Sequence, residues 1–311
     1  MMMQDNRLLL SICIPTDGNV NWILPVLDSI YSQKVDETLF EVVVTDNGEN
    51  SLLPEHITQY HHANLRYIQT HDKGFLNLVT ALKNGRGELC KMLNHRSVLL
   101  PGVISEWLSL VETYLSNRPI IFFSDGEVHG NDYIACKNID ELLKAISYWA
   151  SWSAGISFWK EDIANIDTVE MDGMFPNTSL LLDIRHSPHY LVCNKKYQVM
   201  EDDAGKGGYN LFQTFAVGFL DLVGKQRIKR RIQTNTFIFV KRQLYDFLKL
   251  LYLSEVILPT QHTFELTGIK ESMDVYYGRY YYRKMLFRAW IEVPFYYIKI
   301  ILRRLSVNIS A

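Results

Sequence analysis

The sequence predicts an α/β protein in which a mostly parallel sheet carries helices on both faces, followed by a helical C-terminal region. In the first half of the chain, short apolar runs alternate with segments whose apolar residues have helical spacing, as β-α-β units do. From about residue 211 onward, strand-like runs become rare and long apolar segments of helical length take over. We therefore expect an N-terminal domain over residues 1–210 and a C-terminal region over residues 211–311.

The first β-α-β unit is predicted from three segments. Leu8–Pro15 is a continuous apolar run that ends at a proline, as a strand buried on both faces does. Asn21–Gln33 has apolar residues at helical spacing, the first of them Trp22, and Phe40–Thr45 is rich in β-branched residues. The turn-forming residues 46–48 end this second strand.

The alternation continues, with glycines that separate helices from strands. Further strands are expected at Leu65–Gln69, Leu89–Leu93, Pro119–Ser124 and Ile156–Trp159. Helices are expected at Leu53–His61, Leu76–Asn84, Ile139–Tyr148 and Ser179–Arg185, and in the C-terminal region at Leu211–Val223, Phe237–Leu253 and Tyr276–Leu305.

Composition and cysteine spacing indicate an intracellular globular protein. The 48% hydrophobic and 21% charged residues allow a sizeable core. The four cysteines are scattered, with no Cys-x-x-Cys pair, so we expect reduced thiols, no disulfide framework and no structural metal. The N-terminal apolar run is too short for a signal peptide and is interpreted as the first strand.

Charge is distributed unevenly along the chain. The overall net charge is −2, but residues 225–311 carry +10 and the rest of the chain −12. Such asymmetry indicates an anionic partner for the basic end, either a membrane surface or a nucleic acid.

Polar residues cluster where three predicted strands end. These clusters are residues 16–19, 46–50 and 94–97. In open parallel sheets, ligands bind beyond the carboxyl ends of the strands. Asp46 is suited to accept a ring N–H from a nucleobase, although an Asp-Asn-Gly sequence is also a common turn with no ligand.

The order of these segments resembles the opening of family 2 glycosyltransferases. The similar runs are SICIPTDGN, SIYSQ and FEVVVTDNGEN, then HDKGFLN, GELCKML and LLPG. Asp72 stands where the family has the first Asn of Asn-x-Gly-x-x-Asn. The resemblance covers about residues 8–105, continues more loosely through 152–156, and is greatest to the abequosyltransferase-type branch that builds bacterial surface polysaccharides.

The resemblance implies a GT-A fold and inverting transfer of a sugar from a nucleotide-sugar, with a UDP-sugar favoured, to a glycan or polyprenyl-linked acceptor. The residues implied for donor binding are Pro15, Thr16, Asp17, Asp46, Asn47, Lys73, Asn77, Asn94, His95 and Arg96. The alternative is a catalytically inactive GT-A domain that serves as a binding or assembly partner.

One departure from the family concerns the metal. The family's Asp-x-Asp, which binds Mg²⁺ or Mn²⁺, is replaced by His95-Arg96-Ser97. Hard divalent cations prefer oxygen ligands, usually including a carboxylate, and an arginine repels them. We therefore expect no metal at this position. Arg96, helped by a protonated His95, would then stabilise the leaving diphosphate directly.

Inverting transfer also needs a general base for the acceptor hydroxyl. The resemblance implies a carboxylate from the segment after residues 152–159. Asp172 is our first candidate, because it precedes a glycine and a Phe-Pro break. The other candidates are Asp125, Glu201, Asp202 and Asp203.

The C-terminal segment has opposed apolar and basic faces. A helical wheel places Leu286, Trp290, Val293, Tyr297, Ile300 and Ile301 on one face, and Lys284, Arg288, Glu292, Lys299 and Arg303 on the other. Aromatic and basic residues in this pattern are typical of a helix lying in a membrane interface, but charges interrupt it too often for a span. We expect a cytoplasmic protein attached peripherally to the inner face of an anionic membrane, without nucleic-acid binding. The alternative is a helix packed on its own domain.

Overall fold

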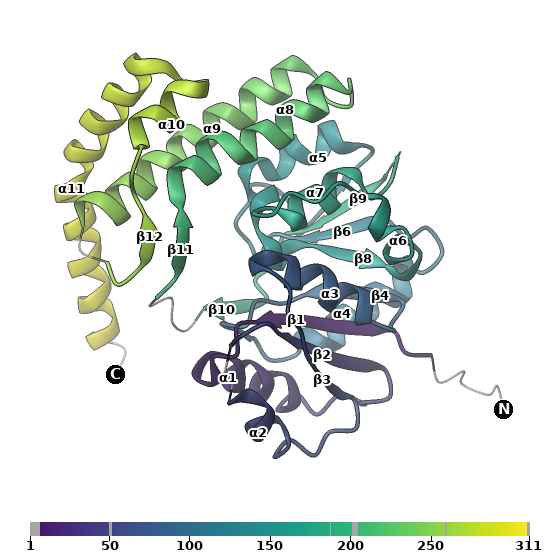
Figure 1. The fold of residues 1–311 in the computed structure, drawn as a ribbon. Helices are drawn as coiled ribbons and strands as arrows, with labels where there is room; N and C mark the ends of the chain where they lie inside the picture. The colour runs from purple at the N-terminus through teal and green to yellow at the C-terminus, as the bar shows by residue number, and fades with distance from the viewer. Residues whose placement is uncertain (1–6, 50–51, 187, 201–204, 259, 310–311) are drawn as a thin grey trace. The chain divides into compact units, whose positions relative to one another are not determined.

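The computed structural model describes residues 7–49, 52–186, 188–200, 205–258 and 260–309, with side chains up to residue 295 (Figure 1). The chain forms two compact units. The first comprises Met1–Asp202 and Gln226–Thr236, and the second comprises Asp203–Lys225 and Phe237–Ala311.

A five-stranded sheet in the order β3-β2-β1-β4-β8 lies at the centre of the first unit. Its strands are β1 (Leu10–Thr16), β2 (Phe40–Asp46), β3 (Leu65–Gln69), β4 (Leu89–Met92) and β8 (Ser157–Trp159). The first four are parallel, and β8 is antiparallel to β4. The predicted α/β fold with a mostly parallel sheet is therefore confirmed.

Helices pack on both faces of this sheet, and the residues of β1 and β2 are almost all buried. Alternate β1 residues, such as Ile12, share a core with α1 (Val20–Tyr31) and α4 (Val103–Tyr114). The residues between them face the other way: the end of α3 (Asn77–Asn84), at Gly85, lies against the Ser11 side chain. Both faces of the sheet are thus covered.

A second, three-stranded sheet follows in the order β6-β9-β7. Its strands are β6 (Ile120–Phe123), β7 (Tyr133–Cys136) and β9 (Tyr190–Cys193). The predicted strand at residues 119–124 exists, but it pairs with β9 and not with the central sheet. A single bridge between Phe122 and Ile156 connects the two sheets.

The other elements of the first unit are short. They are α2 (Leu53–Ile57), which ends earlier than expected, β5 (Ser97–Leu99), α5 (Ile139–Ile146), α6 (Lys160–Ile163), α7 (Pro176–Asp183) and β10 (Gln198–Met200). The four cysteines are free and buried, as expected.

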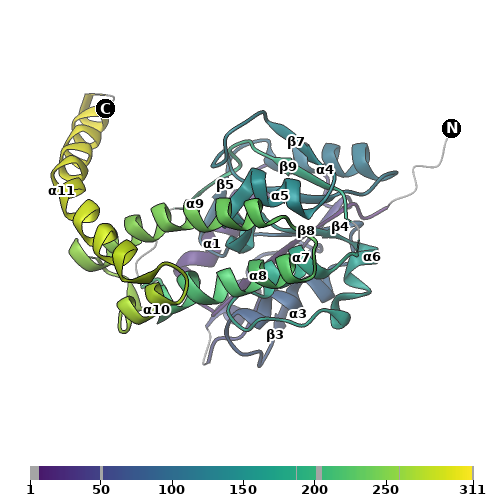
Figure 2. The same cartoon turned by 90° about the horizontal axis from the view of Figure 1, so that it is seen from above.

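The second unit is mainly helical, in agreement with the predicted C-terminal region (Figure 2). Its helices are a π-helix at Gln213–Phe219, most of α8 (Leu220–Ile228) and α9 (Thr234–Tyr252), a π-helix at Leu253–Ile257, α10 (Ile269–Tyr276) and α11 (Gly278–Ile309). A short parallel pair, β11 (Gly207–Asn210) and β12 (Thr263–Glu265), was not predicted. Among the described residues, no helix is long and apolar enough to cross a membrane.

Candidate functional site

The carboxyl ends of β1, β2 and β4 bring the predicted polar clusters to one edge of the sheet. Thr16, the last residue of β1, is in register with Asp46, the last residue of β2. The Leu93 N–H that follows β4 donates to the Cys13 carbonyl of β1 at 2.9 Å. The segment at residues 94–96 therefore emerges beside Thr16.

The turn after β1 is held by its own polar side chains. The Gly18 N–H donates to Thr16 Oγ1 at 3.2 Å, and Gly18 has a positive φ of 83°. Asn19 caps α1 by accepting from the Asn21 N–H at 3.1 Å. Between them the Asp17 side chain is 60% exposed, so its carboxylate is open to a ligand. The neighbouring Pro15 is half-buried.

Asp46 is completely buried, and both its carboxylate oxygens accept hydrogen bonds. Oδ1 accepts from the Gly48 N–H at 2.8 Å, and Oδ2 accepts from the Tyr67 hydroxyl at 2.9 Å. A Cβ on Gly48 would lie 2.0 Å from the Asp17 carbonyl oxygen, so only glycine lets the two turns approach this closely. A base N–H at Oδ2 would take the place of the Tyr67 hydroxyl.

The side-chain amides of Asn47 and Asn77 donate hydrogen bonds to backbone carbonyls. Asn47 Nδ2 donates to the carbonyls of Asp72 and Gly74, at 2.9 and 3.1 Å. Asn77 is buried, and its Nδ2 donates to the carbonyls of Thr16 (3.1 Å) and Thr45 (2.9 Å). Asn77 thus fixes the ends of β1 and β2. Lys73, one turn before it, is exposed.

His95 is held against the end of β1. Its Nδ1 lies 2.9 Å from Thr16 Oγ1 and 3.7 Å from Asp17 Oδ1. Burial, with a smaller contribution from Arg96, lowers the pKa of His95 to about 4 and outweighs the opposing effect of the nearby Asp17. The expectation of a protonated His95 is therefore wrong. At neutral pH the ring is uncharged, because burial destabilises the charged form more than the Asp17 carboxylate stabilises it.

The Arg96 guanidinium lies flat against Trp22, which the sequence pattern had assigned only as an apolar position of a helix. The guanidinium carbon is 3.3 Å from the centroid of the Trp22 ring. Arg96 Nε is 3.4 Å from His95 Nε2, which indicates the tautomer that carries its proton on Nδ1. Asn94 Oδ1 accepts from the Arg96 N–H at 3.0 Å and shapes the loop. Trp22 and His95 together hold the Arg96 guanidinium, which places one permanent positive charge at this edge.

The loop at residues 95–97 does not fit a hard divalent cation. Arg96 is cationic, and Ser97 is buried within β5. Among the described contacts of His95, the nearest carboxylate is that of Asp17, which belongs to the turn after β1. The donor set lacks the adjacent carboxylates that Mg²⁺ or Mn²⁺ requires.

The carboxylates of two candidate general bases, Asp172 and Asp125, already accept hydrogen bonds within the protein. Asp172 Oδ1 accepts from the N–H groups of Met174 (2.8 Å) and Phe175 (2.9 Å), before α7. Asp125 accepts from the Tyr197 N–H at 2.7 Å and pairs with Lys196. No described hydrogen bond or ion pair joins either carboxylate to His95 or Arg96. The candidates Glu201, Asp202 and Asp203 lie outside the described residues.

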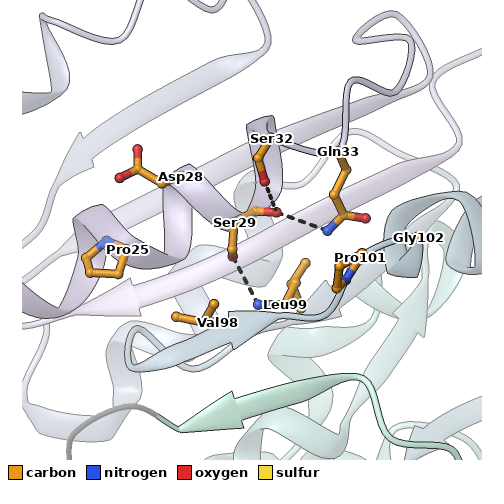
Figure 3. Close-up of a pocket in the computed structure, with 9 residues that line it drawn as sticks. All are labelled: Pro25, Asp28, Ser29, Ser32, Gln33, Val98, Leu99, Pro101 and Gly102. Atoms are coloured by element: carbon orange, nitrogen blue, oxygen red, sulfur yellow. Dashed lines mark hydrogen bonds between the residues drawn. The ribbon is translucent and has the colours of Figure 1, made fainter. Parts of the chain in front are cut away.

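Ser29 of α1 and Gln33, just beyond this helix, accept hydrogen bonds from the segment after β4, and Figure 3 shows the bond of Ser29. Ser29 Oγ accepts from the Leu99 N–H at 3.0 Å, and Gln33 Oε1 accepts from the Ile104 N–H at 3.1 Å. A hollow of about 670 Å³ lies here, between α1 and the residues that flank β5. None of the predicted donor-binding residues lines it, so it is separate from the site at the strand ends.

No protein-family model matches the sequence, and no curated protein matches it. Solved structures are similar in fold. Residues 1–349 of TarS from S. aureus match with 14% identity over 80% of this chain and 75% of that chain, with a TM-score of 0.55. The same fragment in complex with UDP-GlcNAc matches with 15% identity over 78% and 72%, with a TM-score of 0.57. The fold is GT-A-like. The expected fold is therefore confirmed, while the sequence identity is too low to transfer an activity.

Proposed function

We propose that this chain is an inverting glycosyltransferase that moves a sugar from a nucleotide-sugar to a glycan or polyprenyl-linked acceptor. The observation that carries the proposal is Arg96, whose guanidinium is fixed at the carboxyl edge of a GT-A-like sheet by Trp22. A guanidinium there can stabilise the charge that develops on a leaving diphosphate. Surface-polysaccharide synthesis of the abequosyltransferase type is the setting that the sequence resemblance supports.

The nucleotide is assigned to the turns after β1 and β2. Asp17 is exposed and Thr16 is next to it, while Asp46 ends β2 beside them. A UDP-sugar is the favoured donor, because uracil offers a ring N–H to a carboxylate and a similar fold binds UDP-GlcNAc in TarS. His95, uncharged, orients Arg96 through Nε2, and Arg96 alone provides the positive charge.

In the proposed reaction, a carboxylate, assigned first to Asp172, accepts the proton of the acceptor hydroxyl. The hydroxyl oxygen then forms a bond to the anomeric carbon of the donor sugar. The bond between that carbon and the diphosphate oxygen breaks, the oxygen keeps both electrons, and the nucleoside diphosphate leaves. Arg96 stabilises this departing negative charge.

We place the protein peripherally at the cytoplasmic face of a membrane, where a polyprenyl-linked acceptor would be anchored. The exposed apolar side chains in the described part of α11 support this assignment. Another face of the helix packs on its own unit: Met285 and Ala289 are buried, and Arg288 and Glu292, which were predicted on the basic face, pair with Asp246 and Lys249 of α9. The large hydrophobic side chains left exposed on the described part of α11 are Tyr280, Tyr281, Phe287, Trp290, Ile291 and Phe295. The side chains of Tyr297, Lys299, Ile300, Ile301 and Arg303 lie outside those described.

An inactive GT-A-like binding protein is the second candidate, and one observation favours it. Asp172 Oδ1 accepts from N–H groups two and three residues further on, as in a structural turn, and Asp125 is bound to Lys196 and the Tyr197 N–H. A screen of UDP-sugars tests both candidates, with thermal shift for binding and release of UDP for turnover. If the chain is a transferase, the donor that raises its thermal stability is also hydrolysed or transferred, and slow release of UDP is measured. A donor that stabilises the protein but yields no UDP with any acceptor supports the inactive candidate.

A further inference from the structure

A basic turn comprises the last residues of α8 and those that follow it, all of which belong to the first unit. This turn, residues 226–231, has the sequence Gln-Arg-Ile-Lys-Arg-Arg, with four cations among six residues, and no acidic residue follows before Asp246. Ile228, among these cations, is 77% exposed, the largest fraction among the described large hydrophobic side chains. A single exposed apolar side chain is common on protein surfaces, but this one lies in a run of cations, so apolar and positively charged groups are presented together.

Arg230 adopts a backbone conformation that favours glycine. Its φ is 58°. Its N–H donates to the Arg227 carbonyl at 2.9 Å, and the next N–H, of Arg231, donates to the Gln226 carbonyl at 2.9 Å. These two bonds form a Schellman motif, in which the left-handed residue is usually glycine. Glycine would therefore be more stable than arginine at this position of the helix end.

Structural roles explain two of the four cations. Arg231 and Lys229 both bind Asp183 Oδ1, at 2.7 and 3.0 Å. Cations at the end of a helix also interact favourably with its dipole. Neither role explains Arg230, whose side chain makes no ion pair or hydrogen bond among the described residues, or the exposure of Ile228.

A hollow of about 610 Å³ lies beside the basic turn. It is lined by Arg227, Arg230 and Arg231 together with the polar Asn138, Gln233 and Thr234. The one carboxylate that lines it, Asp140, already accepts from the Gln233 N–H at 2.8 Å and pairs with Lys144. The hollow therefore presents cationic and neutral donors, which suit a phosphate group.

We propose that the basic turn docks on an anionic bilayer surface, with its arginines on headgroup phosphates and Ile228 inserted between the lipids. A bilayer offers negative charge and apolar volume at the same depth, which accounts for both the cations and the isoleucine. A nucleic-acid backbone would satisfy the cations but leave Ile228 uncovered. This surface belongs to the first unit, is distinct from α11, and does not depend on glycosyl transfer.

The test is sedimentation of the full chain with vesicles of equimolar phosphatidylcholine and phosphatidylglycerol. Arg230→Gly removes one charge while relieving the backbone, so binding falls about fivefold and thermal stability is unchanged or higher. Lys34→Gly is the matched control, because Lys34 is also exposed and left-handed, with φ 53°. Ile228→Ser also weakens binding about fivefold or more, whereas Leu52→Ser, at a side chain that is 60% exposed, does not.

Three results would overturn the proposal. One is an equal loss of vesicle binding in Arg230→Gly and Lys34→Gly. Another is equally tight binding to vesicles of pure phosphatidylcholine. The third is an Arg230→Gly protein that loses binding to single-stranded RNA but keeps its binding to anionic vesicles.

Discussion

At the scale of single residues, the way Arg96 is held decides whether it can act as a preorganised charge. Trp22 offers its ring face to the guanidinium at 3.3 Å, and His95 offers Nε2 to its Nε at 3.4 Å. A guanidinium fixed in this way needs little reorganisation as the diphosphate leaves. Trp22 is thus a positioning residue for Arg96.

Trp22→Leu keeps an apolar side chain but removes the aromatic face. We expect kcat to fall about tenfold, the scale of a cation–π contact of roughly 1–2 kcal/mol, with little change in the KM for the donor. In an Arg96→Ala background the same change has no further effect on kcat, which a purely structural role of Trp22 would not produce. Trp149→Leu, at another half-buried tryptophan, is the control. Additive losses in the double variant contradict the positioning role.

The proposed contact of Asp46 with the base makes opposite predictions for two variants. Asp46→Ala weakens nucleotide binding by about 1.5–3 kcal/mol, the range for a hydrogen bond to a charged group. Tyr67→Phe removes the hydroxyl that occupies Oδ2, so a base N–H meets less competition and binding tightens. Calorimetry with UDP measures both. If Tyr67→Phe weakens binding as Asp46→Ala does, Asp46 only holds the turn.

Sequence reasoning located some site residues well and others poorly. The meeting of Thr16 and Asp46 follows from the parallel sheet, because strands in register end at the same edge. The use of Asn77 as a clamp on strand ends does not follow, since a buried amide bound to backbone leaves no periodic signal. Trp22 looked like a core position because helical spacing cannot distinguish a ring in the core from a ring stacked on a cation.

At the scale of elements, apolar periodicity predicted the long helices and most of the central strands but missed six strands of three or four residues, which are β5, β7, β9, β10, β11 and β12. The short strands β5, β10, β11 and β12 exist only through their pairing partners. Likewise β6 has the apolar pattern of a central strand, and only its pairing with β9 shows that it belongs to a second sheet. Local sequence contains strand propensity but not strand partners.

The exposed aromatic side chains of α11 lead to a prediction for this element. Phe287 is 68% and Trp290 is 62% exposed, on a helix whose Met285 and Ala289 are buried. The double variant Phe287→Ser/Trp290→Ser should lose about tenfold or more in binding to anionic vesicles, because interfacial binding scales with buried apolar area. Val275→Ser, at an exposed apolar position of α10, is the control. Unchanged flotation of the double variant, at low and at high salt, contradicts an interfacial α11.

At the scale of the whole molecule, a buried lysine affects how stability depends on pH. Lys91 of β4 is almost completely buried between the rings of Trp107 and Phe123, and burial lowers its pKa to about 7. The unfolded state therefore holds more protons than the folded state between about pH 7 and the ordinary lysine pKa of about 10.4. The free energy of unfolding therefore rises with pH across that window. Below pH 7 the folded state bears the full cost of burying a protonated lysine.

Lys91→Met removes this dependence. We expect the variant to be more stable at neutral pH by about 1–4 kcal/mol, the range for replacing buried charged groups by apolar ones. Its stability should also change less between pH 7 and 10. Urea denaturation at several pH values measures both quantities. A variant that is less stable than the parent at every pH would show that the hydrogen bonds from Lys91 Nζ to the Met92 and Ala154 carbonyls outweigh its desolvation.

The central claim, that a fixed guanidinium takes the place of a metal, is tested most directly by chelation. UDP release from the donor identified in the screen is measured for the full chain in excess EDTA, with and without added manganese. The account predicts the same turnover in EDTA as without it, and a loss of about 10²-fold or more in Arg96→Ala, the scale for removing one preorganised group. Turnover that EDTA abolishes and manganese restores, with Arg96→Ala at the parent rate, would contradict it.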